Sequence, residues 1–503
     1  MNSRELNESY LQHKQKFQNY INVIKKSSPW DIYTIVNATL IKNPYTTVFP
    51  LRFFKKELKN NNLIFSFCKN IGLFYIKNIY LYLSFFIAFI LYKIYYKKQR
   101  KNELKTIIDI FGLVDKTNKD GVFSEHYLTG IYDVFEKYNQ QYTILLRLYG
   151  LGRNPFKLIK FLKIIREDKR DIIFEYEFLK FNDFLDLFIL CVLYPFKTLR
   201  LIQKERIEQD KIFNESIIED IRYFNLDSLN RYILGKNLSR IQSIEKIYSW
   251  SEFQVIERSF NYGVRKNNND IKLIACQFYL NYESYFNTYI DDLDYDMLAS
   301  PHEVLVNGQY YVLDRDKVKY ARGVSLRYKN IFHFQGVIEE KNILLLGSYM
   351  EKDTQYMLES VKDFKNVIFK NHPAVDISIF GKLSTNIAIS NENIYELFKN
   401  TKLVIGTASG TAVEAVACGI SVIIIASQDN LTVNPLVEHG KGEIWDIAFS
   451  KDDVPTLYNK LLNYRKNNIE KIKSISLWYK ENFFIEPTEE KIVKLFKLDK
   501  EKK

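Results

Sequence analysis

The sequence predicts an α/β protein with parallel sheets, and two patterns in the chain predict it. From about residue 240 onward, short apolar runs alternate with stretches that have helical spacing. Within these runs the apolar residues stand at consecutive positions, which indicates strands buried on both faces of a parallel sheet. We therefore expect a doubly wound arrangement, in which ligands bind at the carboxyl ends of the strands.

The size and composition of the chain are consistent with this fold. Its 503 residues allow about three domains, or two large ones, at roughly 100–200 residues per domain. Hydrophobic residues make up 47% and charged residues 26%, as expected of a folded globular protein. The 4 Cys have no paired spacing, which excludes a disulfide scaffold and a cysteine-type zinc site. We expect a reducing compartment and no metal site.

The formal net charge of +12 is compatible with an acidic partner. Part of this excess, however, reflects a general abundance of Lys, Asn, Ile, Tyr and Phe in the chain. The sequence contains no zinc-finger or RNP motif and no dense arginine cluster. We therefore expect no nucleic acid among the partners.

The individual elements can be assigned in chain order. Strands are expected at Lys246–Trp250 and Ile271–Tyr279, and the helical stretch between them makes a βαβ unit. Further strands, separated by helices, are expected at Asn342–Tyr349, Asn366–Pro373, Asn386–Ser390, Lys402–Thr407 and Ser421–Ala426. From about Val454 the chain is expected to be helical to its end.

The N-terminal quarter contains an apolar segment with a basic flank. The chain begins with a polar stretch, so we expect no signal peptide. The uncharged run Asn78–Tyr92 is shorter than the ~20 residues that span a bilayer, and a basic run follows it at 97–101. A second apolar patch covers Leu187–Leu201. For Tyr80–Tyr92 a buried core helix, a helix in the membrane interface and a true span all remain open.

The segment Val404–Ala415, VIGTASGTAVEA, carries the sharpest candidate site. A buried strand ends there, and a turn of small residues opens a helix at about Ser409. The free N–H groups of a first helical turn and the helix dipole favour an anion, and Gly410 and Thr411 add little bulk. Glu414, one turn further, could meet a ribose hydroxyl. The alternative is a tight helix–sheet junction with Ser409 as an ordinary N-cap.

A second motif, FKNHP at Phe369–Pro373, lies at the carboxyl end of another expected strand. If the strand alternates, Lys370 and His372 both point toward the crevice. A cation and an imidazole at this position could stabilise a leaving phosphate. The alternative is a structural histidine.

Together the two motifs resemble the C-terminal half of GT-B glycosyltransferases. The pair of an HP dipeptide and a Ser-Gly-Thr turn is similar to that of sialyl- and Kdo-type transferases. The segments WSEFQVIERSFNYGVR, VLVNGQYYV and GVSLRY upstream are similar to a family of surface-carbohydrate (O-antigen) biosynthesis proteins. This resemblance covers roughly residues 110 to 480. It assigns six residues to the donor site: Lys370, His372, Ser409, Gly410, Thr411 and Glu414.

The resemblance implies two Rossmann-like domains in the GT-B architecture, with an added helical, membrane-associating N-terminal region. We expect that region at 1–105, an acceptor domain at 106–330, a nucleotide-sugar-binding domain at 331–475 and a C-terminal helix at 476–503. A GT-B enzyme holds the donor phosphates with helix N–H groups and basic side chains, so neither metal nor cofactor is implied.

The base that takes the acceptor proton should come from the first domain. Glu252, just after an expected strand, is our candidate, and the alternative is a carboxylate that stabilises a helix N-terminus. His302 and His126 are weaker candidates. The spacings in Asp291–Asp296 would suit the metal site of a GT-A enzyme, but we interpret this stretch as a solvated acidic loop.

These observations lead us to expect a glycosyltransferase that builds a bacterial surface polysaccharide, such as capsule or lipopolysaccharide. Its partners would be a nucleotide-sugar donor (a CMP-linked one is favoured by the HP motif), a lipid-linked glycan acceptor and the cytoplasmic membrane surface. The protein would lie on the cytoplasmic face of the inner membrane, peripherally or with a single span. The alternatives are a CDP-alditol phosphotransferase, a sugar-nucleotide epimerase of the same fold, and a non-catalytic scaffold of a membrane glycan-assembly complex.

Overall fold

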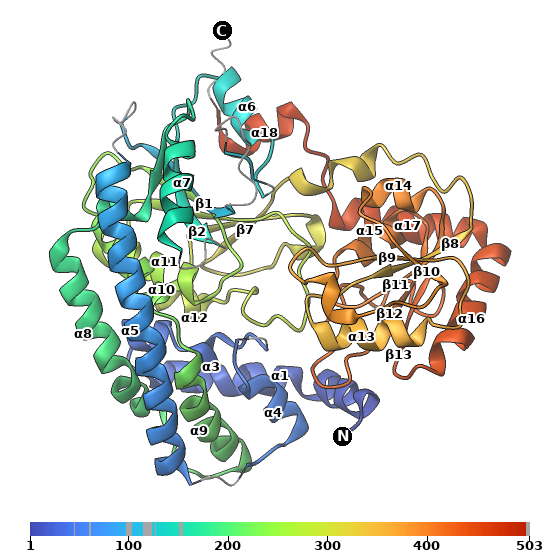
Figure 1. The fold of residues 1–503 in the computed structure, drawn as a ribbon, viewed down its shortest axis with the longest axis horizontal. Coiled ribbons are helices and arrows are strands. Elements are labelled where there is room, and N and C mark those ends of the chain that lie inside the picture. The colour runs from blue at the N-terminus through green and yellow to red at the C-terminus, as the bar shows by residue number, and fades with distance from the viewer. Residues whose placement is uncertain are drawn as a thin grey trace.

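Two parallel sheets form the centre of the molecule (Figure 1). The computed structural model describes residues 1–44, 46–59, 62–96, 103–113, 123–125, 127–149 and 154–498. The first sheet has seven strands in the order β3-β2-β1-β4-β5-β6-β7, and the second has six in the order β10-β9-β8-β11-β12-β13. In each sheet the strand order reverses once, between β1 and β4 and between β8 and β11. Such switch points are where doubly wound folds bind their ligands.

The first sheet lies between residues 106 and 322. Its strands are β1 Thr106–Leu113, β2 Thr143–Tyr149, β3 Ile172–Phe174, β4 Lys246–Trp250, β5 Lys272–Gln277, β6 Glu303–Val306 and β7 Lys319–Arg322. Its helices are α6 Ile131–Lys137, α7 Pro155–Ile165, α8 Phe181–Thr198, α9 Glu208–Asp220, α10 Asp227–Leu238, α11 Val255–Asn267 and α12 Asp292–Asp296. The predicted strand–helix–strand unit is confirmed as β4, α11 and β5.

The second sheet confirms the strands predicted for the second half of the chain. Its strands are β8 Asn342–Leu346, β9 Val367–Lys370, β10 Ile387–Ile389, β11 Thr401–Gly406, β12 Ser421–Ile425 and β13 Trp445–Ala448. Its helices are α13 Glu351–Ser360, α14 Ile394–Phe398, α15 Thr411–Ala417, α16 Asp453–Asn467 and α17 Ile469–Phe483. Every residue of β12 is buried, as its unbroken apolar run requires.

The chain returns to the first domain at its end. The helix expected over 476–503 is two elements: α17 ends at Phe483, and α18 spans Glu489–Phe496. Phe496 packs edge-on against Phe135 of α6, with ring centroids 5.2 Å apart. Figure 1 shows α18 beside α6. The first domain is therefore completed by a segment far beyond residue 330.

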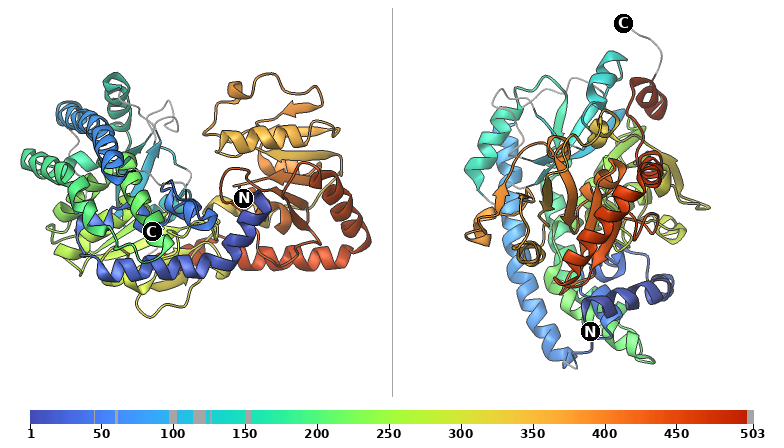
Figure 2. Two further views of the ribbon diagram at one scale, coloured as in Figure 1. Left: turned by 90° about the horizontal axis from the view of Figure 1, so that it is seen from below. Right: turned by 90° about the vertical axis from the view of Figure 1, so that its right-hand side faces the viewer.

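The N-terminal region is helical, and it contacts both domains. Its helices are α1 Ser3–Ser27, α2 Ile32–Ile35, α3 Ala38–Ile41, α4 Phe49–Lys55 and α5 Leu63–Tyr95. Lys14 pairs with Glu283 of the first domain at 2.8 Å. Arg4 lies 3.9 Å from Asp453 of the second domain and 4.8 Å from the ring centre of Phe449. Figure 2 shows α1 along the underside of the molecule, reaching toward the second domain.

The two domains share part of their hydrophobic core. One cluster of buried side chains joins Phe253 and Leu280 of the first domain to Val404 and Ala412 of the second. The architecture is thus that of two Rossmann-like domains in the GT-B arrangement, with an added helical N-terminal region.

Candidate active site

The carboxyl ends of the two sheets meet through the loop that follows β5. The hydroxyl of Tyr285 lies 2.5 Å from that of Tyr349, which follows β8 of the second domain. The hydroxyl of Tyr282 accepts a hydrogen bond from the amide of Gly410, which follows β11. The two strand edges that bind ligands in doubly wound folds therefore meet at one junction between the domains, which we call the interdomain crevice.

Two turns at this crevice have the same unusual backbone conformation. Phe253, after β4, has φ 53°, and Ala408, after β11, has φ 52°. Residues other than glycine adopt this left-handed backbone conformation only at a cost in free energy. Such strain is often retained at functional sites. Glu252 and Ser409 are the neighbours of these two residues, so the folded chain holds both candidates on constrained turns.

Glu252 stands directly after β4 and is half-buried. Trp250 Nε1 donates to its Oε1 at 3.4 Å, and Asn287 Nδ2 donates to its backbone carbonyl at 2.8 Å. Its Oε2 forms no hydrogen bond to the described residues. Helix α11 begins at Val255, and Glu257 Oε2 accepts the N–H of its N-cap residue Gln254 at 2.9 Å, so Glu252 is not the carboxylate that caps this helix.

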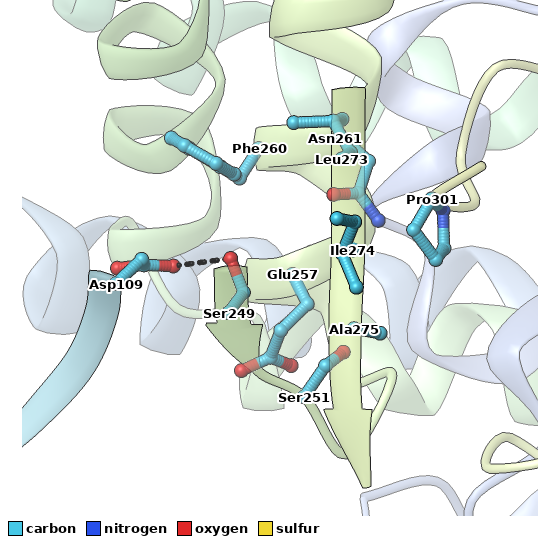
Figure 3. Close-up of a pocket in the computed structure, with 10 residues that line it drawn as sticks. All are labelled: Asp109, Ser249, Ser251, Glu257, Phe260, Asn261, Leu273, Ile274, Ala275 and Pro301. Carbon is cyan, nitrogen blue, oxygen red and sulfur yellow. Dashed lines mark hydrogen bonds between the residues drawn. The ribbon is translucent and has the colours of Figure 1, made fainter. Parts of the chain in front are cut away.

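A buried charge network supports the end of β4. Arg147 Nη1 contacts Glu257 Oε1 at 2.6 Å, and its Nη2 donates to the Trp250 carbonyl at 2.6 Å. Its Nε lies 3.2 Å from Asp109 Oδ1, while Ser249 donates to Asp109 Oδ2 at 3.1 Å (Figure 3). Burial raises the pKa of Glu257 to about 6, which Arg147 opposes. The cavity here measures about 10 Å³, so the network positions the strand end and cannot hold a substrate.

Arg327 is the residue of this crevice that the sequence did not single out. Its guanidinium lies 5.6 Å from the ring centre of Tyr127 and 5.7 Å from that of Trp250. It forms no hydrogen bond or ion pair with the described residues, although it is accessible to solvent. Burial disfavours its charge, but neighbouring phenols and the carboxylates of Glu414 and Glu252 outweigh that effect and raise the pKa of Arg327. The charge of Arg327 thus interacts with a carboxylate of each domain.

Glu414 is buried at the first turn of α15. The Tyr395 hydroxyl donates to its Oε2 at 2.5 Å, and the Thr411 hydroxyl donates a further hydrogen bond. Burial raises the pKa of Glu414, and these two hydrogen bonds and the charge of Arg327 oppose the rise. The Thr411 hydroxyl is therefore engaged with Glu414, whereas we expected it to face a phosphate.

The turn between β11 and α15 differs from expectation in two respects. The helix begins at Thr411 with Gly410 as the N-cap, and no side chain caps it. The alternative interpretation of Ser409 as an ordinary N-cap is therefore wrong, and its hydroxyl has no partner among the described residues. A Cβ on Gly410 would lie 3.2 Å from Leu280 Cδ1, so this glycine allows close approach of the first domain.

His372 follows β9 and adjoins the same crevice. Its Nδ1 accepts the Ala374 N–H at 3.1 Å, which leaves Nε2 as the donor of the neutral ring. Burial lowers the pKa of His372, so the ring is neutral at pH 7. Its ring lies 6.0 Å from that of Tyr349, edge to face. Tyr349 in turn contacts Tyr285 of the first domain, so His372 is linked to that domain through the two tyrosines. Burial raises the pKa of Tyr285, and the charge of Glu252 adds to this rise.

Lys370 is the predicted donor-site residue that the structure does not bring to the others. Its Nζ donates to the backbone carbonyl of Glu392 at 2.6 Å, beside the edge strand β10. Burial lowers the pKa of Lys370, which Glu392 partly offsets. The expected shared direction of Lys370 and His372 is therefore not observed.

The weaker sequence candidates lie elsewhere. His302 stands at the amino end of β6, where its Nδ1 accepts the Leu273 N–H at 3.1 Å, and burial lowers its pKa to about 4. This is the edge opposite to the crevice, so His302 has a structural role. His126 lies outside the described residues.

The acidic stretch 291–296 is not a solvated loop, which corrects our interpretation. It contains the short helix α12, and Asp294 is buried against Lys25 and Arg258, each at 2.7 Å. Burial raises the pKa of Asp294, but the charges of Arg258 and Lys25 reverse this and hold the pKa far below its usual range. Arg258 Nε also donates to the Phe253 carbonyl at 3.0 Å. The described residues contain no group of three or more His, Cys, Asp or Glu placed to hold a metal ion.

A larger groove lies away from this crevice. It measures about 740 Å³ and is lined by the connection between the domains and by α15, α16 and α17. It meets α15 at 417–419, the end opposite to Ser409, and none of the predicted site residues lines it. We therefore place the candidate site in the crevice, where Glu252, Arg327, His372 and Glu414 come from both domains.

Comparison with known proteins gives structural similarities alone. No protein-family model and no curated protein matches the chain. The UDP-GlcNAc 2-epimerase of Methanocaldococcus jannaschii has a TM-score of 0.39 and 13% identity over 78% of this chain and 100% of its own. The spinosyn rhamnosyltransferase SpnG has a TM-score of 0.43 and 10% identity over 78% and 100%. The wall teichoic acid polymerase TagF has a TM-score of 0.37 and 12% identity over 88% and 97%. Similarities this low carry no conclusion about activity, which must come from the site.

Proposed function

We propose that this protein is a metal-independent glycosyltransferase that takes a sugar from a nucleotide-sugar donor and transfers it to a lipid-linked glycan of a bacterial surface polysaccharide. The observation that supports it best is the junction of two Rossmann-like domains, where the charge of Arg327 interacts with the carboxylates of Glu252 from the first domain and Glu414 from the second. A CMP-linked donor is the form we expect first.

The second domain would hold the donor. The Ser409 hydroxyl has no partner among the described residues, and Ser409 follows the strained residue Ala408 at the switch point of the second sheet. The buried Glu414 carboxylate, fixed by Tyr395, would meet a ribose hydroxyl. Arg327 would bind a phosphate oxygen, since guanidinium groups bind phosphate through paired hydrogen bonds.

The first domain would activate the acceptor. In an inverting transfer, the free Oε2 of Glu252 would take the proton of the acceptor hydroxyl as that oxygen attacks the anomeric carbon. The bond from this carbon to the donor phosphate would break, and the nucleotide would leave with the electron pair. His372 Nε2–H would donate a hydrogen bond to the leaving phosphate, where negative charge develops.

A panel of CMP, CDP, UDP and GDP compounds tests the donor assignment. We expect one nucleotide class to raise the melting temperature, because a ligand bound to the native state alone stabilises it. Ser409→Ala should weaken that nucleotide by ~10- to 100-fold, since a hydrogen bond to a charged group contributes ~1.5–3 kcal/mol. The melting temperature without ligand should not change, because Ser409 caps no helix.

Ser384→Ala is the matched control, since Ser384 is exposed in the same domain and its hydroxyl has no partner among the described residues. It should leave both the nucleotide Kd and the melting temperature unaltered. Failure of every nucleotide to bind would overturn the proposal. A nucleotide sugar epimerised without any acceptor would instead establish the epimerase alternative.

His372→Ala tests the leaving-group role. We expect nucleotide release from the donor to slow by ~10²-fold or more, as for the loss of a transition-state hydrogen-bond donor. Circular dichroism should be unchanged, because the ring is half-buried at a loop. His333→Ala, an exposed histidine of the connection between the domains, serves as the control. Turnover close to that of the unaltered enzyme would make His372 structural.

A further inference from the structure

The helix α5 presents a long apolar face that no described residue covers. Its 33 residues are long and apolar enough to cross a membrane, yet only 17% of its most apolar stretch is buried. Ile76, Ile79, Leu83 and Ile87 are exposed along it. Soluble monomers rarely expose continuous apolar patches of this kind, except at an interaction site.

The neighbouring helix α8 extends this face. Its exposed apolar residues are Phe181, Leu185, Phe188, Ile189, Leu193 and Phe196. Between the two helices, Phe184 of α8 packs against Phe85 and Phe86 of α5, with ring centroids 5.7 and 5.1 Å apart. In Figure 1 both helices lie at the left edge of the molecule, away from the second domain. We name the exposed residues of α5 and α8 together the α5–α8 face.

The opposite side of α5 is bound to the first domain. Phe74 stacks on Tyr194 of α8 at 5.7 Å. Asn70 Nδ2 donates to the Ile218 carbonyl at 3.1 Å, and Lys77 Nζ donates to the Phe224 carbonyl at 3.0 Å. To span a bilayer, α5 would lose these contacts and leave buried polar groups of the domain without partners. The helix is therefore arranged to lie in the plane of a membrane surface, with one side in lipid.

The end of this face near the C-terminus of α5 is basic. The helix α7 packs against α5, and its charged residues are all lysines: Lys157, Lys160 and Lys163. Phe156, at its start, is exposed. In the sequence, a further run of basic residues follows α5 at 97–101, outside the described residues. Basic residues beside an apolar face are the composition that anionic bilayer surfaces attract.

We propose that the α5–α8 face binds an anionic lipid bilayer in the plane of its surface, with α7 as the headgroup contact. Of the three alternatives for this segment, the proposal selects the helix that lies in the membrane interface. It rejects both the transmembrane helix and the fully buried core helix. Vesicle binding requires no substrate, so its measurement tests this proposal independently of the proposed transferase activity.

The apolar arm of the test uses two matched triple variants. Ile76→Ser/Ile79→Ser/Ile87→Ser removes side chains that are 73%, 51% and 52% exposed. The control Ile338→Ser/Ile379→Ser/Ile389→Ser removes side chains that are 78%, 47% and 53% exposed in and next to the second domain. Phe85, Phe86 and Phe89 are left intact, because they pack against Phe184.

Co-flotation is measured with vesicles of phosphatidylcholine containing about 30% phosphatidylglycerol, an anionic lipid. We expect the α5 triple variant to bind at least ~10-fold more weakly, because each isoleucine loses its apolar contact with lipid. The control variant should bind like the unaltered protein. Both should keep the melting temperature, since the replaced side chains are exposed.

The charge arm separates lipid charge from apolar contact. Lys157→Gln/Lys160→Gln should reduce binding to these anionic vesicles by about tenfold or more, since each lysine near such a surface is worth roughly fivefold. Lys362→Gln/Lys365→Gln, exposed lysines of the second domain, should have no effect. Neither pair should change binding to vesicles of phosphatidylcholine alone.

Three outcomes would overturn the proposal. Equal binding by the two isoleucine variants would exclude the α5–α8 face. Resistance of the bound protein to extraction by alkaline carbonate would mean that α5 spans the bilayer. Dissociation of an oligomer by the α5 triple variant, with vesicle binding unchanged, would make the face an interface between copies of this chain.

Discussion

Replacing Arg327 by alanine is expected to weaken binding of the donor nucleotide by roughly 10- to 100-fold. Arg327 has no hydrogen-bond partner among the described residues, so its donors are available for a phosphate. A hydrogen bond to a charged group contributes ~1.5–3 kcal/mol, which sets this range. Arg327→Lys should recover only part of the loss, because lysine keeps the charge but not the planar stacking on Tyr127 and Trp250. Isothermal titration with the nucleotide found by the panel measures both.

The same substitution should change the pH dependence of binding. Burial raises the pKa of Glu414, and the charge of Arg327 opposes the rise. Binding that needs the Glu414 carboxylate is complete above this pKa and lost as the pH falls through it. Without Arg327 the pKa of Glu414 is higher, so the loss of binding should begin at a higher pH than in the unaltered protein. This shift follows from the loss of the Arg327 charge alone, so the Kd at pH 7, and not the pH profile, tests whether Arg327 contacts the donor.

Arg322→Ala is the matched control, since Arg322 is an exposed arginine at the end of β7, five residues before Arg327. It should leave both the Kd and its pH profile unchanged. If Arg327→Ala binds the nucleotide normally at pH 7, the guanidinium does not touch the donor. The phosphate-binding role that we assign to Arg327 would then be wrong.

The fold could be predicted because its determinants are local. The strands β8, β11 and β12 are short, unbroken apolar runs between turn residues, and such runs have few alternatives to a buried parallel strand. Helices separate these strands in the sequence, and this alternation indicates a doubly wound parallel sheet. In contrast, the return of α18 to α6 depends on contacts between residues far apart in sequence, such as Phe135 and Phe496. No pattern within the last segment indicates it.

The candidate site could be predicted in part, for the same reason. The turn at Ser409 and the loop of His372 follow recognisable strands, so their approximate place was predictable. The partners of their side chains were not. Lys370 meets the Glu392 carbonyl, and the Thr411 hydroxyl meets Glu414, because of local geometry that spacing does not encode.

Arg327 lies in the GVSLRY segment that carries part of the family resemblance, but that resemblance assigned it no role. The residue lies in the short 3-10 helix Leu326–Phe332 between the two sheets, and only the fold brings Tyr127 and Trp250 beside it. An arginine in the connection between two expected Rossmann-like domains is a feature that the sequence analysis could have included among the candidates. The interpretation of the stretch around Asp294 was wrong for the opposite reason. Its acidic residues indicated exposure to solvent, but Asp294 is buried in ion pairs with Lys25 and Arg258, which are distant in sequence.

Replacing Glu252 by glutamine is expected to reduce turnover by ~10²- to 10⁴-fold, the range for loss of a general base. Glutamine keeps the shape and can still accept the hydrogen bond from Trp250 Nε1, but it cannot take a proton. The Kd of the donor nucleotide should not change, because Glu252 belongs to the acceptor side of the crevice. The measurement is the rate of nucleotide release in the presence of acceptor, together with the Kd from titration.

Two further variants separate proton transfer from positioning. Glu283→Gln, an exposed carboxylate of the loop after β5 that pairs with Lys14, should leave turnover unchanged. Asn287→Ala removes the 2.8 Å hydrogen bond to the Glu252 carbonyl, so it should lower turnover less than Glu252→Gln does, without altering how the rate depends on pH. If Glu252→Gln retains near-normal turnover, the base lies elsewhere. If it abolishes nucleotide binding instead, Glu252 serves the donor, and the roles that we assign to the two sides of the crevice must be exchanged.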